Sequence, residues 1–133
     1  MLILPDTSCW IEFFRPRGDE AIRSQLLNWL AADCLAVCAP VRVEILRGAG
    51  KAEVPHIVEA FAVLPYLESV DEDWIAVEQK IRTLADKGCT VPLLDLLIAV
   101  IVHRHGAVLA HRDAHFQMVE QVLPVRQHSF IAT

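Results

Sequence analysis

Two acidic side chains follow short apolar segments of the chain. Asp6 comes soon after segment 2–4, and Asp113 comes shortly after segment 107–110. Each acid has a plain structural explanation, as a turn residue or as the cap of the helix that follows. If both segments are strands of one parallel sheet, the two acids also lie at the same sheet edge, beyond the carboxyl ends of the strands. Ligands bind at that edge in sheets of this kind.

Two further acids lie within apolar helical sequence. The neighbours of Asp95 one helical turn away are apolar, and an ionised carboxylate in such surroundings costs several kcal/mol unless a cation or donors meet it. The helix dipole offsets only about 0.3–1 kcal/mol near a helix N-terminus, so a cation or a donor network is implied. Glu44 is flanked by apolar residues, with the small Gly48 one turn on, although a solvated glutamate is the alternative.

Carboxylates that converge on one pocket repel one another unless they are protonated or bridged by a divalent metal ion. Oxygen ligands suit hard cations such as Mg²⁺ and Mn²⁺. Mg²⁺ typically binds a few carboxylates together with water and phosphate oxygens, which indicates phosphoryl chemistry. In that chemistry one or two metal ions activate a water and stabilise the leaving oxygen. The predicted catalytic and metal-binding residues are Asp6, Glu44, Asp95 and Asp113.

Short apolar segments that alternate with helical patterns must position these acids. The predicted strands are 2–4, 35–38, 67–70, 107–110 and 125–131. The predicted helices lie at about 8–14, 20–30, 40–48, 54–64, 73–87, 92–105 and 115–122. Thr7 or Ser8 is expected to cap the first helix, and Asp71 the helix over 73–87. The pattern predicts one α/β domain, 1–133, with a mainly parallel sheet of four or five short strands flanked by helices.

The composition is that of a folded domain rather than a disordered chain. Of the 133 residues, 54% are hydrophobic, which is enough for a proper core. The longest nearly apolar run, 93–102, is too short for a membrane span, which needs about 20 residues. The first residues lack the pattern of a signal peptide, so we expect a cytoplasmic protein with free thiols. Those thiols are Cys9, Cys34, Cys38 and Cys89.

The net charge at first argues against a nucleic-acid partner. Seventeen acidic and twelve basic residues give a formal charge of −5, which is not typical of an overall basic nucleic-acid binder. Without the four predicted ligands, 13 acidic residues face 12 basic ones, a balance of −1. The excess acidity is therefore concentrated at the predicted site.

Four segments in register carry a resemblance to a known family: 6–12, 43–48, 95–99 and 111–116. On these segments, which span essentially the whole chain, the sequence resembles the PIN-domain ribonucleases, especially VapC-type toxins of bacterial toxin–antitoxin pairs. The resemblance implies a PIN-like, Rossmann-like three-layer fold and Mg²⁺- or Mn²⁺-dependent cleavage of RNA. It also implies frequent homodimers and neutralisation by a VapB-like antitoxin. The family's acidic positions map onto the same four acids.

Residues close to the four acids have supporting roles in this interpretation. The resemblance favours hydrogen bonds from Thr7 and Ser8 to Asp6 or to a metal-bound water. Many family members carry Thr or Ser two residues before the last acid, where this chain has His111, which could donate to a carboxylate or to the scissile phosphate. Arg47 and Arg112 lie close in sequence to the acids and are candidates for binding RNA phosphates.

Three other functions can be weighed on the same residues. The negative charge and the departure at His111 suit a non-catalytic α/β binding module for a protein or RNA partner. His111 and His115 are four residues apart, but no HExxH or paired CxxC motif supports a zinc site. A phosphatase of the haloacid-dehalogenase type fits poorly, because Thr-Ser-Cys follows Asp6 and no second acid stands two residues later.

The first two predicted helices are unusually apolar for a small domain. Their large apolar residues suit a dimer surface, a groove for a partner helix, or ordinary core packing. The residues concerned are Phe13, Phe14, Leu26, Leu27, Trp29 and Leu30.

Overall fold

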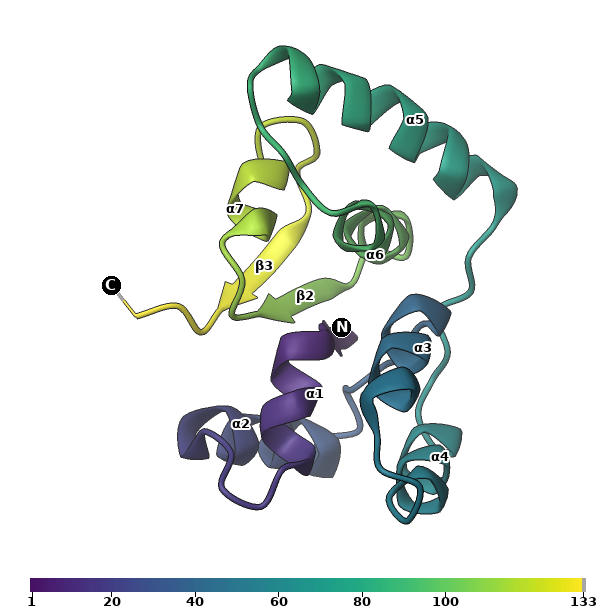
Figure 1. Ribbon diagram of the computed structural model, residues 1–133, viewed down its shortest axis with the longest axis vertical. Helices are drawn as coiled ribbons and strands as arrows, with labels where there is room; N and C mark the ends of the chain where they lie inside the picture. The colour runs from purple at the N-terminus through teal and green to yellow at the C-terminus, as the bar shows by residue number, and fades with distance from the viewer. Residues whose placement is uncertain (133) are drawn as a thin grey trace.

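The computed structural model describes residues 1–132 (Figure 1), and Thr133, the last residue of the predicted domain, lies outside them. Within that range the strands are β1 (Ile3–Pro5), β2 (Val108–His111) and β3 (Arg126–Ser129). The helices are α1 (Thr7–Phe14), α2 (Glu20–Ala31), α3 (Ala39–Gly48), α4 (Val54–Ala62), α5 (Asp71–Asp86), α6 (Leu93–Arg104) and α7 (His115–Val119). The predicted α/β class is confirmed.

The sheet is parallel in the order β1-β2-β3, so the described residues form three strands and not the four or five expected. The predicted strand 35–38 is reduced to isolated parallel bridges, Leu35 with Ile3 and Val37 with Tyr66, and the predicted strand 67–70 does not form, since the second bridge ends just before it. Helix α3 begins soon after the first bridge, and Pro65, beside the second, has no N–H to extend the pairing. Neither segment therefore forms a full strand.

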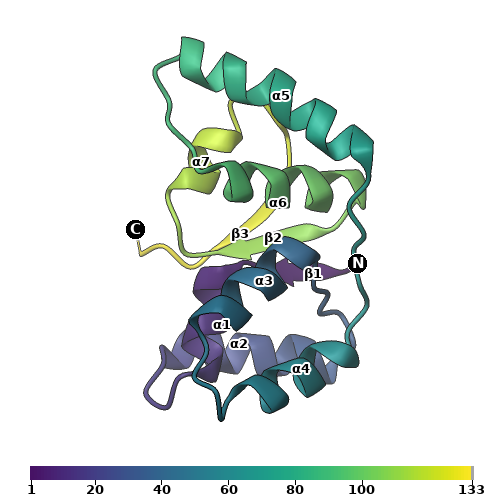
Figure 2. The same cartoon turned by 45° about the vertical axis from the view of Figure 1, so that its right-hand side comes forward.

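Helices cover both faces of the sheet. Figure 2 shows α5, α6 and α7 above the strands and α1 to α4 below them. The core of the upper layer is α6, in which every residue from 96 to 102 is buried. This helix is apolar all round, as the sequence predicted, because it lies between the sheet and α5. Asp95 lies one residue before the buried stretch, at the start of the helix.

An aromatic cluster joins α1 to α4 below the sheet. The ring of Trp10 lies 5.4 Å from Phe13, 5.6 Å from Phe14 and 5.1 Å from Phe61 between centroids. Most of the early apolar residues therefore pack within the domain, although the side chain of Leu27 on α2 is 52% exposed. The apolar helices serve mainly as core, with part of their surface open to solvent.

Two turns of the chain require glycine. A Cβ on Gly18 would lie 1.7 Å from the carbonyl oxygen of Glu12, so only glycine fits where the chain turns from α1 into α2. Gly106 has a φ of +67°, which glycine adopts without strain, where α6 ends before β2.

The helix caps differ in part from those predicted. Asp6 caps α1, which is one of the two structural explanations that the sequence offered for it, and Thr7 and Ser8 do not, because the carboxylate of Asp6 accepts a hydrogen bond from the N–H of Cys9. At α5, the carboxylate of Asp73 accepts from the N–H of Val70, so Asp73 and not Asp71 satisfies this helix start. Helix α7 ends at Val119, three residues earlier than predicted. None of the helices within residues 1–132 is long and apolar enough to cross a membrane.

Candidate active site

The ends of β1 and β2 deliver two of the predicted acids to one edge of the sheet. Asp6 follows β1 directly, and its N–H donates to the carbonyl of Ala110 on β2 at 2.9 Å. Asp113 follows the end of β2 by two residues. The parallel pairing of the strands therefore brings residues more than one hundred positions apart to the same edge, as the sequence predicted.

Asp6 is almost fully buried, with 4% of the residue exposed. One carboxylate oxygen accepts hydrogen bonds from the hydroxyl of Ser8 at 2.7 Å and from the N–H of Cys9 at 3.1 Å. Burial raises the pKa of Asp6 to about 6, although both hydrogen bonds act to lower it. The structure thus fixes the position of this carboxyl. A cation beside it would stabilise its charged form.

Glu44 reaches the site from α3. Its carboxylate oxygen Oε1 accepts a hydrogen bond from the hydroxyl of Thr7, the first residue of α1, at 2.6 Å. Because Thr7 and Ser8 are adjacent in the chain, one turn of α1 holds two acids through two hydroxyl groups.

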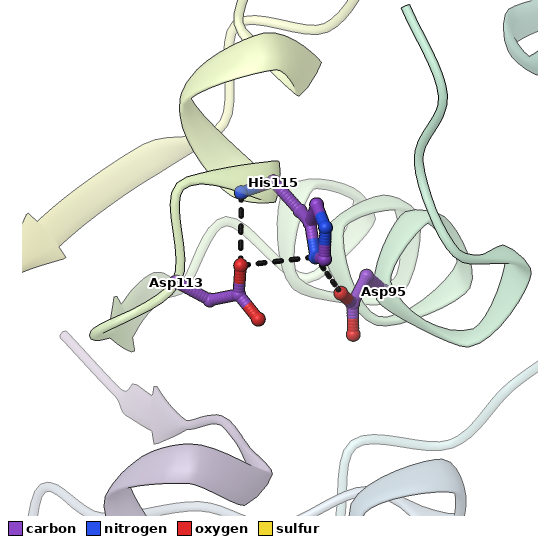
Figure 3. A group of neighbouring side chains, drawn as sticks. All are labelled: Asp95, Asp113 and His115. Carbon is purple, nitrogen blue, oxygen red and sulfur yellow. Dashed lines mark hydrogen bonds and ion pairs between the residues drawn. The ribbon is translucent and has the colours of Figure 1, made fainter.

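Asp95 and Asp113 are joined by a histidine. Nδ1 of His115 lies 3.1 Å from Oδ2 of Asp95 and 2.9 Å from Oδ1 of Asp113 (Figure 3). The backbone N–H of His115 also donates to Oδ1 of Asp113, at 3.0 Å. One ligand atom from each residue lies within 4.8 Å of the others, so the three could hold a metal ion.

His115 is the site residue that sequence reasoning missed. It stands in the segment 111–116 that carries the family resemblance, but the sequence pattern presents it only as half of a histidine pair. Its position at the first residue of α7, two residues after Asp113, was the available signal. A residue placed there lies beside the end of β2 and faces the start of α6.

Electrostatic interactions link all four predicted acids. Burial raises the pKa of Asp95, and the negative charge of Asp113 raises it further, while the hydrogen bond with His115 acts in the opposite direction. The charge of Glu44 raises the same pKa, and the charge of Asp95 in turn raises the pKa of Asp6. Asp95 therefore interacts electrostatically with each of the other three acids, while the described residues close enough together to hold one ion are Asp95, Asp113 and His115. A catalytic role for all four acids stays a prediction.

His111 is fully buried, and both of its ring nitrogens have partners. Nε2 lies 2.7 Å from the amide oxygen of Gln127, which can only accept, so Nε2 carries the proton. The amide of Gln127 is fixed because it donates to the carbonyl of Phe116.

That protonation leaves Nδ1 of His111 free to accept from the N–H of Asp113 at 3.2 Å, and burial lowers the pKa of the ring. His111 thus orients the loop of Asp113 as a neutral side chain. The expectation that it donates to a carboxylate or a phosphate is corrected, and His111 and His115 face different partners and form no zinc pair.

The two arginines singled out for RNA binding differ in their surroundings. The guanidinium of Arg112 lies 3.7 Å from the buried carboxylate of Glu12 and 3.6 Å from that of Asp19. Arg47 is exposed in the last turn of α3. Arg112 is thus partly neutralised within the domain, and the RNA-binding role of both residues stays a prediction.

A groove of about 340 Å³ lies between α1, α3 and α4. Its lining is largely apolar, and Glu44 is part of it, so the groove adjoins the acidic cluster. We call it the α1–α4 groove; its lining includes Ile11, Phe14, Arg15, Glu44, Ile45 and Ile57.

Comparison with known proteins decides the family. The PIN domain family matches residues 3–121. The chain belongs to the PIN-domain family. Two similar proteins are VapC ribonuclease Mb1587 of Mycobacterium bovis and Ribonuclease VapC11 of Mycobacterium tuberculosis. Each is 35% identical to this chain over an alignment of 133 positions, and the alignment covers 97% of this chain and 99% of the relative. The DNA-bound VapBC of Salmonella typhimurium contains a chain of the same fold, with a TM-score of 0.77 at 21% identity and coverage of 97% and 98%.

The donor set of this PIN domain fits a divalent cation. Asp95 and Asp113 lie together at the edge of the sheet with His115, and burial and the charges of neighbouring acids raise the pKa values of Asp6 and Asp95. Such an arrangement is costly unless positive charge is brought to it. Carboxylate oxygens are the donors that Mg²⁺ and Mn²⁺ prefer. Both the donor atoms and the electrostatics of the PIN domain therefore favour a divalent cation.

Proposed function

We propose that this PIN domain is a metal-dependent endoribonuclease and the toxin of a toxin–antitoxin pair. The observation that carries the proposal is the acidic edge of the sheet, where Asp95 and Asp113 lie close enough, with His115, to hold one ion and Asp6 follows β1 directly. The names of the curated relatives, which are ribonucleases, support RNA as the substrate.

In this proposal Asp6, Glu44, Asp95 and Asp113 hold Mg²⁺ or Mn²⁺. The bound ion supplies activation of a water and stabilisation of charge on the phosphate and the leaving oxygen. Cleavage in this manner leaves a 5′-phosphate and a 3′-hydroxyl.

The chain itself contributes fixed positions for the donor atoms. The hydroxyls of Thr7 and Ser8 orient the carboxylates of Glu44 and Asp6, and His111 orients the backbone of Asp113. Because these neighbours are set before substrate arrives, little reorganisation accompanies binding.

RNA cleavage by an Asp95→Asn variant tests the catalytic proposal. We expect Mg²⁺-dependent cleavage of a mixed RNA substrate by the wild type, its loss in a chelator, and a rate about 10³-fold lower in the variant, since several kcal/mol of transition-state stabilisation are removed. Asp33→Asn is the matched control, because Asp33 is exposed, and asparagine tolerates its φ of +55°. Equal activity in wild type and Asp95→Asn contradicts the proposal. The remaining function would then be the non-catalytic binding module.

The partner in this proposal is a VapB-like antitoxin that occupies the α1–α4 groove. The similar chain from Salmonella typhimurium belongs to a VapBC assembly bound to DNA, which supports a complex of this kind. The groove offers apolar surface beside the acids, with Ile11 47% exposed, so a bound segment would also cover the approach to Glu44.

Co-expression with the product of the adjacent short reading frame tests this partner. We expect co-purification with the wild type and binding about tenfold weaker with Ile11→Glu, because a charge in the groove must be desolvated on binding. Val63→Glu is the control, since Val63 is 78% exposed and is not among the residues that line the groove. Equal binding by both variants would place the partner elsewhere.

A further inference from the structure

His115 faces the acidic cluster through a single ring atom. Nδ1 makes the contacts with both Asp95 and Asp113, at 3.1 and 2.9 Å (Figure 3). The side chain is 38% exposed, so the ring is held at the rim of the site. Its backbone is fixed as well, because its N–H donates to the same carboxylate of Asp113. The imidazole is therefore positioned from two sides.

The two distances from Nδ1 are those between adjacent ligands around one ion, and all three atoms lie within 4.8 Å of one another. Around an octahedral ion with bonds of about 2.1 Å, neighbouring donor atoms lie about 3.0 Å apart. A single proton on Nδ1 serves two carboxylates poorly, since a good hydrogen bond is nearly linear. With the proton on Nε2, Nδ1 instead presents a lone pair toward the two carboxylates. The arrangement thus suits a shared cation.

We propose that Nδ1 of His115 is a ligand in the ion site and that this nitrogen biases the site toward Mn²⁺ over Mg²⁺. The inference rests on the proposed function, which places a divalent ion among the four acids. Mg²⁺ selects oxygen donors, whereas imidazole nitrogen suits transition-metal ions. Four carboxylates alone would bind Mg²⁺ and Mn²⁺ with more similar affinities. The added imidazole nitrogen would raise the affinity for Mn²⁺ relative to that for Mg²⁺.

Pulsed electron paramagnetic resonance of Mn²⁺ bound to the full chain tests the ligand directly. We expect the wild type to show the nitrogen coupling of a directly bound imidazole. His115→Asp, which keeps an oxygen donor, removes the coupling and lowers the ratio of Mn²⁺ to Mg²⁺ affinity, measured by isothermal titration, on the order of tenfold. His56→Asp is the matched control: His56 is exposed in the first turn of α4, where an acid is favourable, and both readouts stay unchanged.

The outcomes separate this inference from the proposed function. If Mn²⁺ binds the wild type and Asp95→Asn abolishes that binding, but no nitrogen coupling is seen, the ion site stands and the role of His115 is overturned. A coupling that persists in His115→Asp comes from another nitrogen and overturns the role equally. If Mn²⁺ does not bind the wild type at all, the metal dependence of the proposed function fails together with the inference. A wild-type spectrum without nitrogen coupling overturns the role of His115 even where a variant does not fold.

Discussion

The two halves of the acidic site are held in different ways. Asp6 and Glu44, the hydroxyl-held pair, accept hydrogen bonds of 2.7 and 2.6 Å from neighbouring hydroxyls on α1. Asp95 and Asp113, the histidine-held pair, share Nδ1 of His115 instead. A hydroxyl fixes a carboxylate without adding charge, whereas an imidazole nitrogen is also a metal ligand. The first pair is thus preorganised, and the second can exchange its contact with histidine for a contact with an ion.

The largest effect is expected at the buried member of the hydroxyl-held pair. Asp6→Asn should lower RNA cleavage about 10³-fold and, without metal, raise the free energy of unfolding at pH 7.5 by about 1–3 kcal/mol. The folded-state pKa of about 6 exceeds the ordinary value of 3.8. The protonated form therefore stabilises the fold fully below pH 3.8, and this contribution is lost as pH rises through about 6. Asparagine keeps the acceptor and removes the charge that is costly to bury.

Urea unfolding of both proteins checks the stability of Asp6→Asn, with Asp33→Asn as the control at an exposed position. The variant gains stability only if the ionised carboxylate is costly in the folded protein. A variant less stable than the wild type would show that the hydrogen bonds from Ser8 and Cys9 outweigh the cost of burial.

The same carboxyl predicts opposite pH dependences for cleavage and for stability. Cleavage should fall about tenfold between pH 7.5 and pH 5, because Asp6 with a pKa of about 6 becomes protonated and cannot hold the ion. The raised pKa of Asp95 steepens that fall. Without metal, the contribution of Asp6 to stability increases over the same decrease in pH. Rates at limiting ion concentration, with unfolding curves at each pH, check both slopes; a cleavage rate unchanged down to pH 5 contradicts the assignment.

The sequence could single out these acids, whose catalytic role stays a prediction, because each is marked by its immediate sequence neighbours. Asp6 and Asp113 closely follow apolar strands, and Asp95 interrupts an apolar helix, so each stands out within a few residues. The contact between His115 and Asp95 spans twenty positions and depends on how α7 lies against α6. No local pattern contains that orientation. For the same reason the pairing of His111 with Gln127 on β3 was not predicted.

The fold was predicted best where hydrophobic pattern alone decides it. Helix α6 is buried through most of its length, and its pattern is unambiguous. Segments 35–38 and 67–70 were also predicted to be strands, yet 35–38 contributes only isolated bridges and 67–70 contributes none. Strand pairing depends on the hydrogen-bond partners that neighbouring segments offer, which a pattern of apolar residues does not contain. The sequence left the cap of α1 open among Asp6, Thr7 and Ser8, because all three belong to the residue types that cap helices.

A smaller effect is expected when one hydroxyl of the first pair is removed. Thr7→Val keeps the shape of the side chain but loses the hydrogen bond to Glu44, so cleavage should fall about five- to tenfold. Thr83→Val is the matched control, because the Thr83 hydroxyl is exposed on α5 and donates to the carbonyl of Gln79. Single-turnover rates compare the two. An equal rate in Thr7→Val and wild type would mean that Glu44 needs no hydroxyl to hold its position.

The smallest effect on cleavage is expected behind the histidine-held pair. Gln127→Leu removes the acceptor of the Nε2–H of His111, and a buried donor without a partner costs about 1–3 kcal/mol of unfolding free energy. Cleavage should fall only about two- to threefold, because Nδ1 of His111 still accepts from the N–H of Asp113. Gln117→Leu on α7 is the exposed control, and urea unfolding measures both. Unchanged stability in Gln127→Leu would show that the buried imidazole finds another partner, and the proton assignment that makes Nδ1 the acceptor for Asp113 would fall with it.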